Sequence, residues 1–228
     1  MKIKNAAVFL VSVMLAGTVF GQIKVACMGD SITAGFGVKN KRTHSYPSRL
    51  SELMGEKYDV RNFGASGRTL LRGEKEAYLA TGQYKKAQEF NGDIITFKLG
   101  TNDSKAKHWA NKDNMEKDLN AWIDDLRNAN SNVVIYLCLP VPVFSRNGGD
   151  REGKGINSQN VRDILPVIKK VAKDRKTKLI DLHTPLLSHP EYFPDGVHPN
   201  EEGALAIAKE IHMALTKDKK SEANKEKE

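Results

Sequence analysis

A serine, a histidine and an aspartate occur in sequence contexts that suit acyl transfer. Ser31 lies in the segment Gly29-Asp30-Ser31-Ile32-Thr33, and Asp195 precedes His198 by three residues across a turn that contains glycine. A serine hydroxyl is a weak nucleophile until an imidazole takes its proton, and that imidazole needs an acceptor on its other nitrogen to present the correct tautomer. We therefore predict Ser31 as the nucleophile, His198 as the general base and Asp195 as the group that orients it.

The same chemistry needs hydrogen-bond donors fixed where negative charge develops on the tetrahedral intermediate. The candidates are the backbone amides of Ser31 and Gly64 and the side-chain amide of Asn102. Glycine at position 64 leaves nothing to block the approach of a substrate to its N–H. Arg68 and Trp109 follow shortly after these segments and are candidate substrate-binding residues, with ordinary loop surface as the alternative.

Other polar residues near these segments receive structural interpretations. Asp30 and Asp103 are interpreted as braces of their loops. Ser66 is a rival nucleophile, but its surroundings do not match the Gly-x-Ser-x-Gly elbow of α/β-hydrolases, so a role in a turn is favoured. We predict no metal site, because His183 and His189 have no third ligand at a suitable spacing.

The elements that must position these groups can be read from the apolar pattern. Five segments rich in β-branched residues predict strands at Ile23 to Met28, Asp59 to Phe63, Ile94 to Leu99, Val133 to Leu139 and Lys178 to Leu182. Amphipathic helical patterns lie between them. This alternation predicts an α/β fold with a five-stranded parallel sheet covered on both faces, in which ligands bind beyond the carboxyl ends of the strands.

Four sequence blocks resemble those of the SGNH (GDSL-type) hydrolases. They are Gly-Asp-Ser-Ile-Thr, Asn-Phe-Gly, Leu-Gly-Thr-Asn-Asp and Asp-Gly-Val-His-Pro-Asn, and the resemblance extends from Ile23 to about Leu215. The residues that name the family map onto Ser31, Gly64, Asn102 and His198. The resemblance implies a three-layer αβα sandwich of flavodoxin-like type and ester hydrolysis that uses neither metal nor cofactor.

Longer motifs narrow the resemblance. Ser-Gly-Arg-Thr-Leu, Lys-Leu-Gly-Thr-Asn-Asp-Ser-Lys and His-Pro-Glu-Tyr-Phe-Pro-Asp-Gly-Val-His-Pro-Asn are similar to segments of exported bacterial esterases that remove O-acetyl groups from saccharides. This implies a small-molecule or oligosaccharide ester substrate. The alternatives are a lysophospholipase or thioesterase, an acyltransferase, and a carbohydrate-binding protein without turnover, which has no need of the complete set of candidate catalytic groups.

The ends of the chain and its charge complete the predictions. Residues 1–21 combine Lys2 and Lys4 with an apolar run and small residues, which predicts a signal peptide and export to the periplasm or the medium, with no stable membrane insertion after cleavage. The hydrolase domain is expected over residues 22–216, and a charged disordered tail over residues 217–228. The net charge is +8, but basic and acidic residues are interspersed, which gives no support to nucleic-acid binding.

Two further predictions concern particular residues. Cys27 and Cys138 lie in apolar strand-like runs, which favours buried free thiols, with a disulfide left open. Pro166 is expected to kink or restart the helix predicted over Val161 to Lys173, because proline removes a hydrogen bond of the helix interior.

Overall fold

A computed structural model describes residues 21–145, 151–152 and 155–225. The predicted signal peptide, apart from Gly21, lies outside these ranges. Among the residues described, no helix is both long enough and apolar enough to cross a membrane.

The centre of the molecule is a parallel sheet whose strands are β1 (Ile23–Gly29), β2 (Tyr58–Gly64), β3 (Ile94–Lys98), β4 (Val134–Cys138) and β7 (Lys178–Ile180). Their order is β2-β1-β3-β4-β7, and all four neighbouring pairs are parallel. Each predicted strand is thus confirmed. Gly29 pairs with both Gly64 and Lys98, so the loops that follow β1, β2 and β3 leave the same edge of the sheet side by side.

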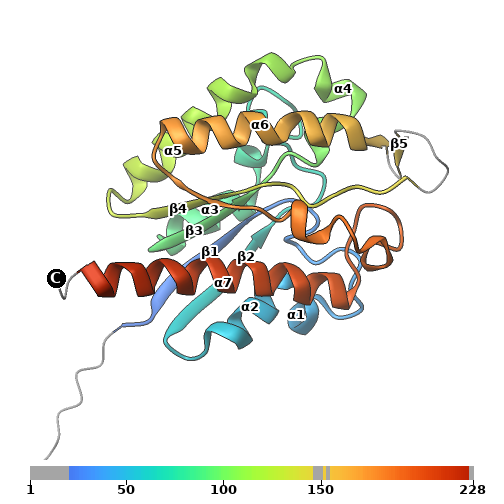
Figure 1. Ribbon diagram of the computed structural model, residues 1–228. Helices are drawn as coiled ribbons and strands as arrows, with labels where there is room; N and C mark the ends of the chain where they lie inside the picture. The colour runs from blue at the N-terminus through green and yellow to red at the C-terminus, as the bar shows by residue number, and fades with distance from the viewer. Residues whose placement is uncertain (1–20, 146–150, 153–154, 226–228) are drawn as a thin grey trace, which may run out of the picture.

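Helices cover both faces of the sheet, which makes the predicted three-layer sandwich (Figure 1). One face carries α3 (Gly82–Phe90), α5 (Met115–Ala129) and α6 (Ser158–Asp174). The other carries α2 (Tyr46–Met54) and α7 (Glu201–Lys225). Shorter elements are α1 (Lys41–His44), α4 (Ala106–Trp109), the turns η1 (Tyr78–Ala80), η2 (Asn102–Ser104), η3 (Lys112–Asn114), η5 (Thr184–Leu186) and η6 (Pro190–Tyr192), and the antiparallel pair β5 (Arg151–Glu152) and β6 (Ile156–Asn157).

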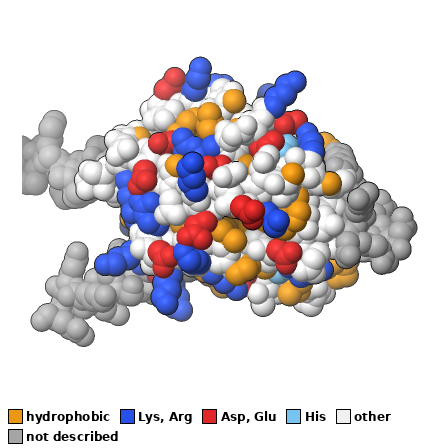
Figure 2. All heavy atoms as spheres, turned by 90° about the horizontal axis from the view of Figure 1, so that it is seen from above, with side chains coloured by type: hydrophobic (Ala, Val, Ile, Leu, Met, Phe, Trp, Pro, Cys, Tyr) orange, Lys and Arg blue, Asp and Glu red, His pale blue; other side chains and the backbone are white. Residues whose placement is uncertain are grey.

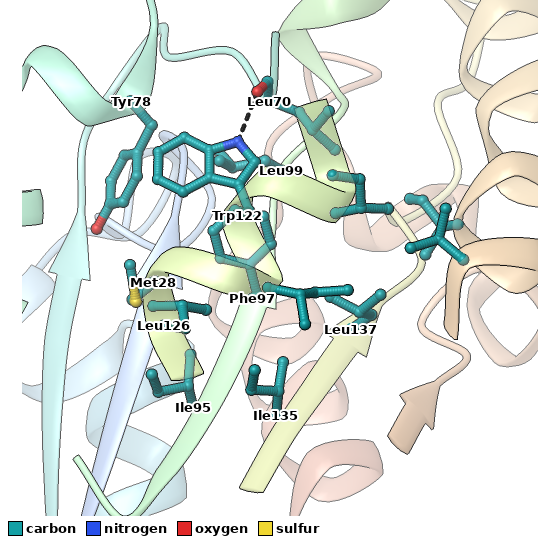
Figure 3. Packing of buried hydrophobic residues seen from close by; sticks show 14 of the residues in the cluster. Met28, Leu70, Tyr78, Ile95, Phe97, Leu99, Trp122, Leu126, Ile135 and Leu137 are labelled. Carbon is teal, nitrogen blue, oxygen red and sulfur yellow. Dashed lines mark hydrogen bonds between the residues drawn. The ribbon is translucent and has the colours of Figure 1, made fainter. Parts of the chain in front are cut away.

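Alternate residues of β1, β3 and β4 enter two separate hydrophobic cores. Above the sheet, side chains of β1, β3 and β4 pack against Trp122 of α5, whose indole N–H donates to the Leu70 carbonyl at 2.7 Å (Figure 3). Below it, Cys27 and Cys138 are buried free thiols, as the sequence favoured. Burial raises the pKa of Cys27 to about 12, because the thiolate would lose its hydration.

Two expectations about helices need correction. Helix α6 runs unbroken through Pro166, so it does not restart there. The proline has no N–H to donate to the Arg162 carbonyl, but both residues are exposed, so water can donate to that carbonyl. The tail expected over residues 217–228 is helical as far as Lys225, because α7 continues to that residue. Asp218 anchors this part of α7 by accepting a hydrogen bond from Tyr136 at 3.0 Å.

The surface carries charges of both signs. On the face shown in Figure 2, basic and acidic side chains are interspersed, with apolar side chains between them. Such a mixture is typical of a solvated surface and gives no single-signed patch on this face for a polyanion.

Candidate active site

The predicted nucleophile, base and orienting residue meet at the carboxyl edge of the sheet. Ser31 lies in the turn after β1, and His198 precedes α7. The Ser31 Oγ is 2.9 Å from His198 Nε2, and His198 Nδ1 is 2.7 Å from Asp195 Oδ2. A carboxylate accepts but does not donate, so Nδ1 carries the proton and Nε2 is left to accept the serine hydroxyl proton. Three residues thus form a hydrogen-bonded relay.

Asp195 holds the backbone as well as the imidazole. Its Oδ1 accepts from the amides of Val197 at 3.0 Å and His198 at 2.7 Å, while Oδ2 binds the ring. Partial burial acts to raise the pKa of Asp195, but the hydrogen bonds from His198 and Val197 outweigh it and leave this pKa below its ordinary value. The carboxylate therefore stays ionised at neutral pH beside His198.

An aromatic ring that sequence reasoning missed packs on the base. Phe36 stands with its ring centroid 4.4 Å from that of His198. Gly37 follows with a φ of +102°, and a Cβ there would come 2.5 Å from the Pro199 carbonyl oxygen. Only glycine lets the chain pass so close to the His198 loop. The two rings are tilted by 51°, so the phenyl group packs obliquely against the imidazole.

A buried ion pair involves Asp30, the residue before the predicted nucleophile. The Lys98 Nζ, at the end of β3, is 3.1 and 3.0 Å from the two carboxylate oxygens of Asp30, and both side chains are fully buried. Lys98 also donates to Thr101 Oγ1 at 3.0 Å, and Asp30 accepts from the Ile32 amide at 3.0 Å. The pair therefore connects the turn of Ser31 to the loop before Asn102. Asp30 is a brace, as interpreted, and its partner Lys98 was missed.

Asn102 and Asp103 serve different purposes. The Asn102 Nδ2 donates one hydrogen to the Arg68 carbonyl at 3.1 Å, which leaves its second N–H for the cleft. Asp103 is fully buried and accepts from the amides of Leu70 at 3.0 Å and Leu71 at 2.9 Å, so it braces the loop after β2 as interpreted. Burial raises the pKa of Asp103 to about 6.

Gly64 is not placed as the sequence predicted. Its N–H already donates to Asn62 Oδ1 at 2.9 Å, which corrects its assignment as an oxyanion donor. A Cβ at Gly64 would come 2.1 Å from the Ala34 nitrogen, so the glycine is required for packing against the turn of the nucleophile. Gly67, three residues later, lines the cleft with a φ of +76°. Within the described residues, the amides of Ser31 and Gly67 have no acceptor.

The cleft around these groups has a volume of about 220 Å³. It is lined by Ser31, Phe36, Ser66, Gly67, Thr101, Asn102, Lys105, Ile156, Val197 and His198. The predicted binding residues Arg68 and Trp109 do not line it. Arg68 contributes its carbonyl to Asn102, and Trp109 lines a neighbouring hollow.

One group of potential metal ligands occurs within the part of the chain that the structure describes. Glu74, Glu76 and His108 offer ligand atoms that all lie within 4.8 Å of one another. Glu74 is already bonded to His108 Nδ1 at 2.9 Å and to Asn111, and Glu76 pairs with Lys107. Each of the two carboxylates thus already has a protein partner, and the group is not part of the cleft lining.

This chain is similar to known proteins in sequence and in fold. The model of the GDSL-like lipase/acylhydrolase family matches residues 27–206. An acetylxylan esterase of Xylanibacter ruminicola is 34% identical over 212 residues, which are 85% of this chain and 43% of that protein. This chain thus spans less than half the length of that relative.

Solved structures share the fold. An acetyl xylan esterase superposes with a TM-score of 0.66 at 25% identity, over 85% of this chain and 100% of that one. A carbohydrate acetylesterase from Sinorhizobium meliloti gives a TM-score of 0.67 at 15% identity, over 86% of this chain and 99% of that one, and shows likeness of fold alone.

The ion pair between Lys98 and Asp30 makes a prediction about stability. Lys98→Met should lower the free energy of unfolding by about 3–5 kcal/mol, because it leaves the Asp30 carboxylate buried without a partner. The double variant Lys98→Met/Asp30→Asn should recover much of this loss. Urea unfolding measures both, with the exposed Lys107→Met as the control that changes little. A loss in Lys98→Met no larger than in the control would contradict the role assigned to the pair.

Proposed function

Because this chain belongs to the GDSL-like lipase/acylhydrolase family, we propose that it is an esterase that hydrolyses small acyl esters through an acyl-enzyme on Ser31. O-acetyl esters of saccharides are the favoured substrates. The observation that carries the proposal is the continuous chain of contacts from Ser31 through His198 to Asp195, at 2.9 and 2.7 Å, on the wall of an accessible cleft.

In the first half of the reaction, Ser31 Oγ attacks the ester carbonyl as its proton passes to His198 Nε2. The negative charge on the carbonyl oxygen is met by the amides of Ser31 and Gly67 and by the second N–H of Asn102, all of which line the cleft. His198 then gives the proton to the leaving alcohol. Asp195, ionised because its pKa is lowered, stabilises the imidazolium between these transfers.

In the second half, water enters the place of the alcohol. His198 Nε2 takes a proton from that water as the water oxygen attacks the acyl carbon. The bond to Ser31 Oγ then breaks, His198 returns the proton to Ser31 Oγ, and the carboxylic acid leaves. The same three donors meet the second tetrahedral intermediate. Capture of the acyl-enzyme by a sugar hydroxyl in place of water would make the enzyme an acyltransferase, and the ratio of free acid to transferred ester distinguishes the two.

The size of the cleft supports a short acyl group. Its volume of about 220 Å³ is small against the 300–1,000 Å³ of pockets that take drug-sized ligands. Phe36, Ile156 and Val197 supply apolar walls suited to a methyl group. A lysophospholipase or thioesterase needs room for a long chain. Relatives named as acetylxylan esterases support an acetyl group on a saccharide.

Replacement of the nucleophile tests the reaction. Ser31→Ala should abolish hydrolysis of nitrophenyl acetate and release of acetate from acetylated xylan, because no acyl-enzyme can form. Ser66→Ala, which changes a second serine of the same cleft, is the matched control and should retain turnover. With the unaltered protein, activity should fall from acetyl to butyryl to long-chain nitrophenyl esters. Undiminished hydrolysis by Ser31→Ala, or faster turnover of long chains, would refute the proposal.

Asn102→Ala tests the oxyanion donors. Loss of one fixed donor should lower kcat by about 10²–10³ and leave KM nearly unchanged, because the donor acts on charge that develops in the transition state. Asn111→Ala, which removes an amide that binds Glu74 outside the cleft, is the control. A raised KM with an unchanged kcat would show that Asn102 binds the ground state instead.

We also infer that the protein acts outside the cytoplasm, because the N-terminal pattern of residues 1–21 is typical of a signal peptide. Expression of the whole chain in a Gram-negative host should yield protein in the periplasm or the medium whose first residue lies close to Gln22. Edman sequencing and cell fractionation measure this. Recovery of protein that begins at Met1 in the cytoplasm would contradict export.

A further inference from the structure

A second hollow adjoins the cleft of the candidate active site. Its volume is about 620 Å³, and its lining includes Lys105, Lys107, Trp109, Asn157 and Asn160. Lys105 lines both spaces, and Ile156 of the cleft is the chain neighbour of Asn157 in the hollow. A molecule whose ester group reaches Ser31 can therefore extend past Lys105 into the second space.

The lining combines one aromatic ring with several polar groups. Part of Trp109 packs on the upper core, and the rest of it lines the hollow. Asn157 uses its Oδ1 to accept from the Asn160 amide at 2.8 Å, and Asn160 uses its Nδ2 to donate to the Ser104 carbonyl at 2.8 Å. Within the described part of the chain, this leaves the Asn157 Nδ2 and the Asn160 Oδ1 for a ligand.

These internal hydrogen bonds also make the polar groups rigid. Asn157 is the N-cap of α6, and its backbone amide donates to Ser104 Oγ at 3.1 Å. Asn160 lies in the first turn of the same helix. Each side chain is held by a hydrogen bond at one of its two polar atoms, Asn157 at Oδ1 and Asn160 at Nδ2. Because the side chains are already ordered, little side-chain entropy is lost when a ligand binds to the other polar atom.

We propose that the second hollow binds a sugar unit next to the acetylated one, so that the enzyme prefers an oligosaccharide or polysaccharide to an acetylated monosaccharide. This inference rests on the proposed function and specifies its substrate. A sugar ring presents a face of C–H groups that suits the Trp109 indole, and hydroxyls around its edge that suit the free ends of the two asparagine amides. Lys112, an exposed residue that does not line the hollow, holds its Nζ 5.9 Å from the Trp109 ring centroid.

A long acyl chain fits this lining less well. Such a chain has no hydrogen-bonding groups, so its burial would take the Asn157 Nδ2 and the Asn160 Oδ1 out of water without replacement partners. The hollow therefore suits the alcohol side of the ester.

The experiment compares substrates of different length. The ratio of kcat/KM for acetylated xylo-oligosaccharides to kcat/KM for acetylated methyl xyloside should fall about tenfold in Trp109→Ala, mainly through KM for the longer substrate. Asn157→Ser keeps a good N-cap while removing the free amide, and should lower the same ratio. Leu187→Ala, which removes a half-exposed apolar side chain that lines neither space, is the control and should leave the ratio unchanged. Thermal unfolding checks that the variants are folded.

Other results would overturn the inference. An unchanged ratio in both Trp109→Ala and Asn157→Ser means that the hollow takes no sugar. A selective loss of activity on long-chain nitrophenyl esters in Trp109→Ala would assign it to the acyl chain instead. NMR titration of the inactive Ser31→Ala variant with deacetylated xylo-oligosaccharide measures binding without turnover. The Kd of the double variant Ser31→Ala/Trp109→Ala should be about tenfold higher than that of Ser31→Ala. If no ester is hydrolysed by the unaltered protein, the proposed function fails, and this titration alone decides the inference.

Discussion

The buried Lys98–Asp30 pair is the interaction on which the geometry of the candidate site depends. Two full charges without solvent contact are costly unless each is neutralised and hydrogen-bonded, and here the ammonium contacts both carboxylate oxygens and the Thr101 hydroxyl. Asp30 is the residue before the nucleophile, and Thr101 is the residue before Asn102. A shift of the Asp30 turn would separate two buried charges, and a shift of the Thr101 loop would break a buried hydrogen bond to the Lys98 ammonium. The pair therefore fixes the nucleophile relative to a candidate oxyanion donor.

Sheet topology determines why this pair can form. In the strand order β2-β1-β3-β4-β7, the chain leaves β1 toward β2 on one side and leaves β3 toward β4 on the other. Crevices at such switch points are where open α/β sheets bind ligands. Ser31 follows β1 and Asn102 follows β3, so they occupy the two sides of that crevice. His198 and Asp195 come from the loop before α7 and complete the site, with the ring of Phe36 packed against His198.

The strands, the layers and the contact between His198 and Asp195 could be predicted from the sequence because each leaves a local signature. Apolar runs gave the strands, and Asp195 with His198 lie three residues apart in one turn, so their contact is nearly local. Gly64 was assigned wrongly as a donor because a motif does not reveal that Asn62 occupies its N–H. Gly67, Phe36 and the hollow at Trp109 depend on how loops fold over one another. Lys98 did leave a signal, since a lysine within an apolar strand needs a buried partner, but the identity of that partner required the register of β1 and β3.

The central claim is that Ser31 becomes covalently acylated, and a mechanism-based label tests it most directly. The protein should be incubated with a nitrophenyl phosphonate, which phosphonylates an activated serine, and then digested and mapped by mass spectrometry while esterase activity is followed. The account predicts a single adduct on the peptide that contains Ser31, formed in step with the loss of activity and absent from His198→Ala. An adduct on Ser66, or full activity after complete labelling of Ser31, would contradict it.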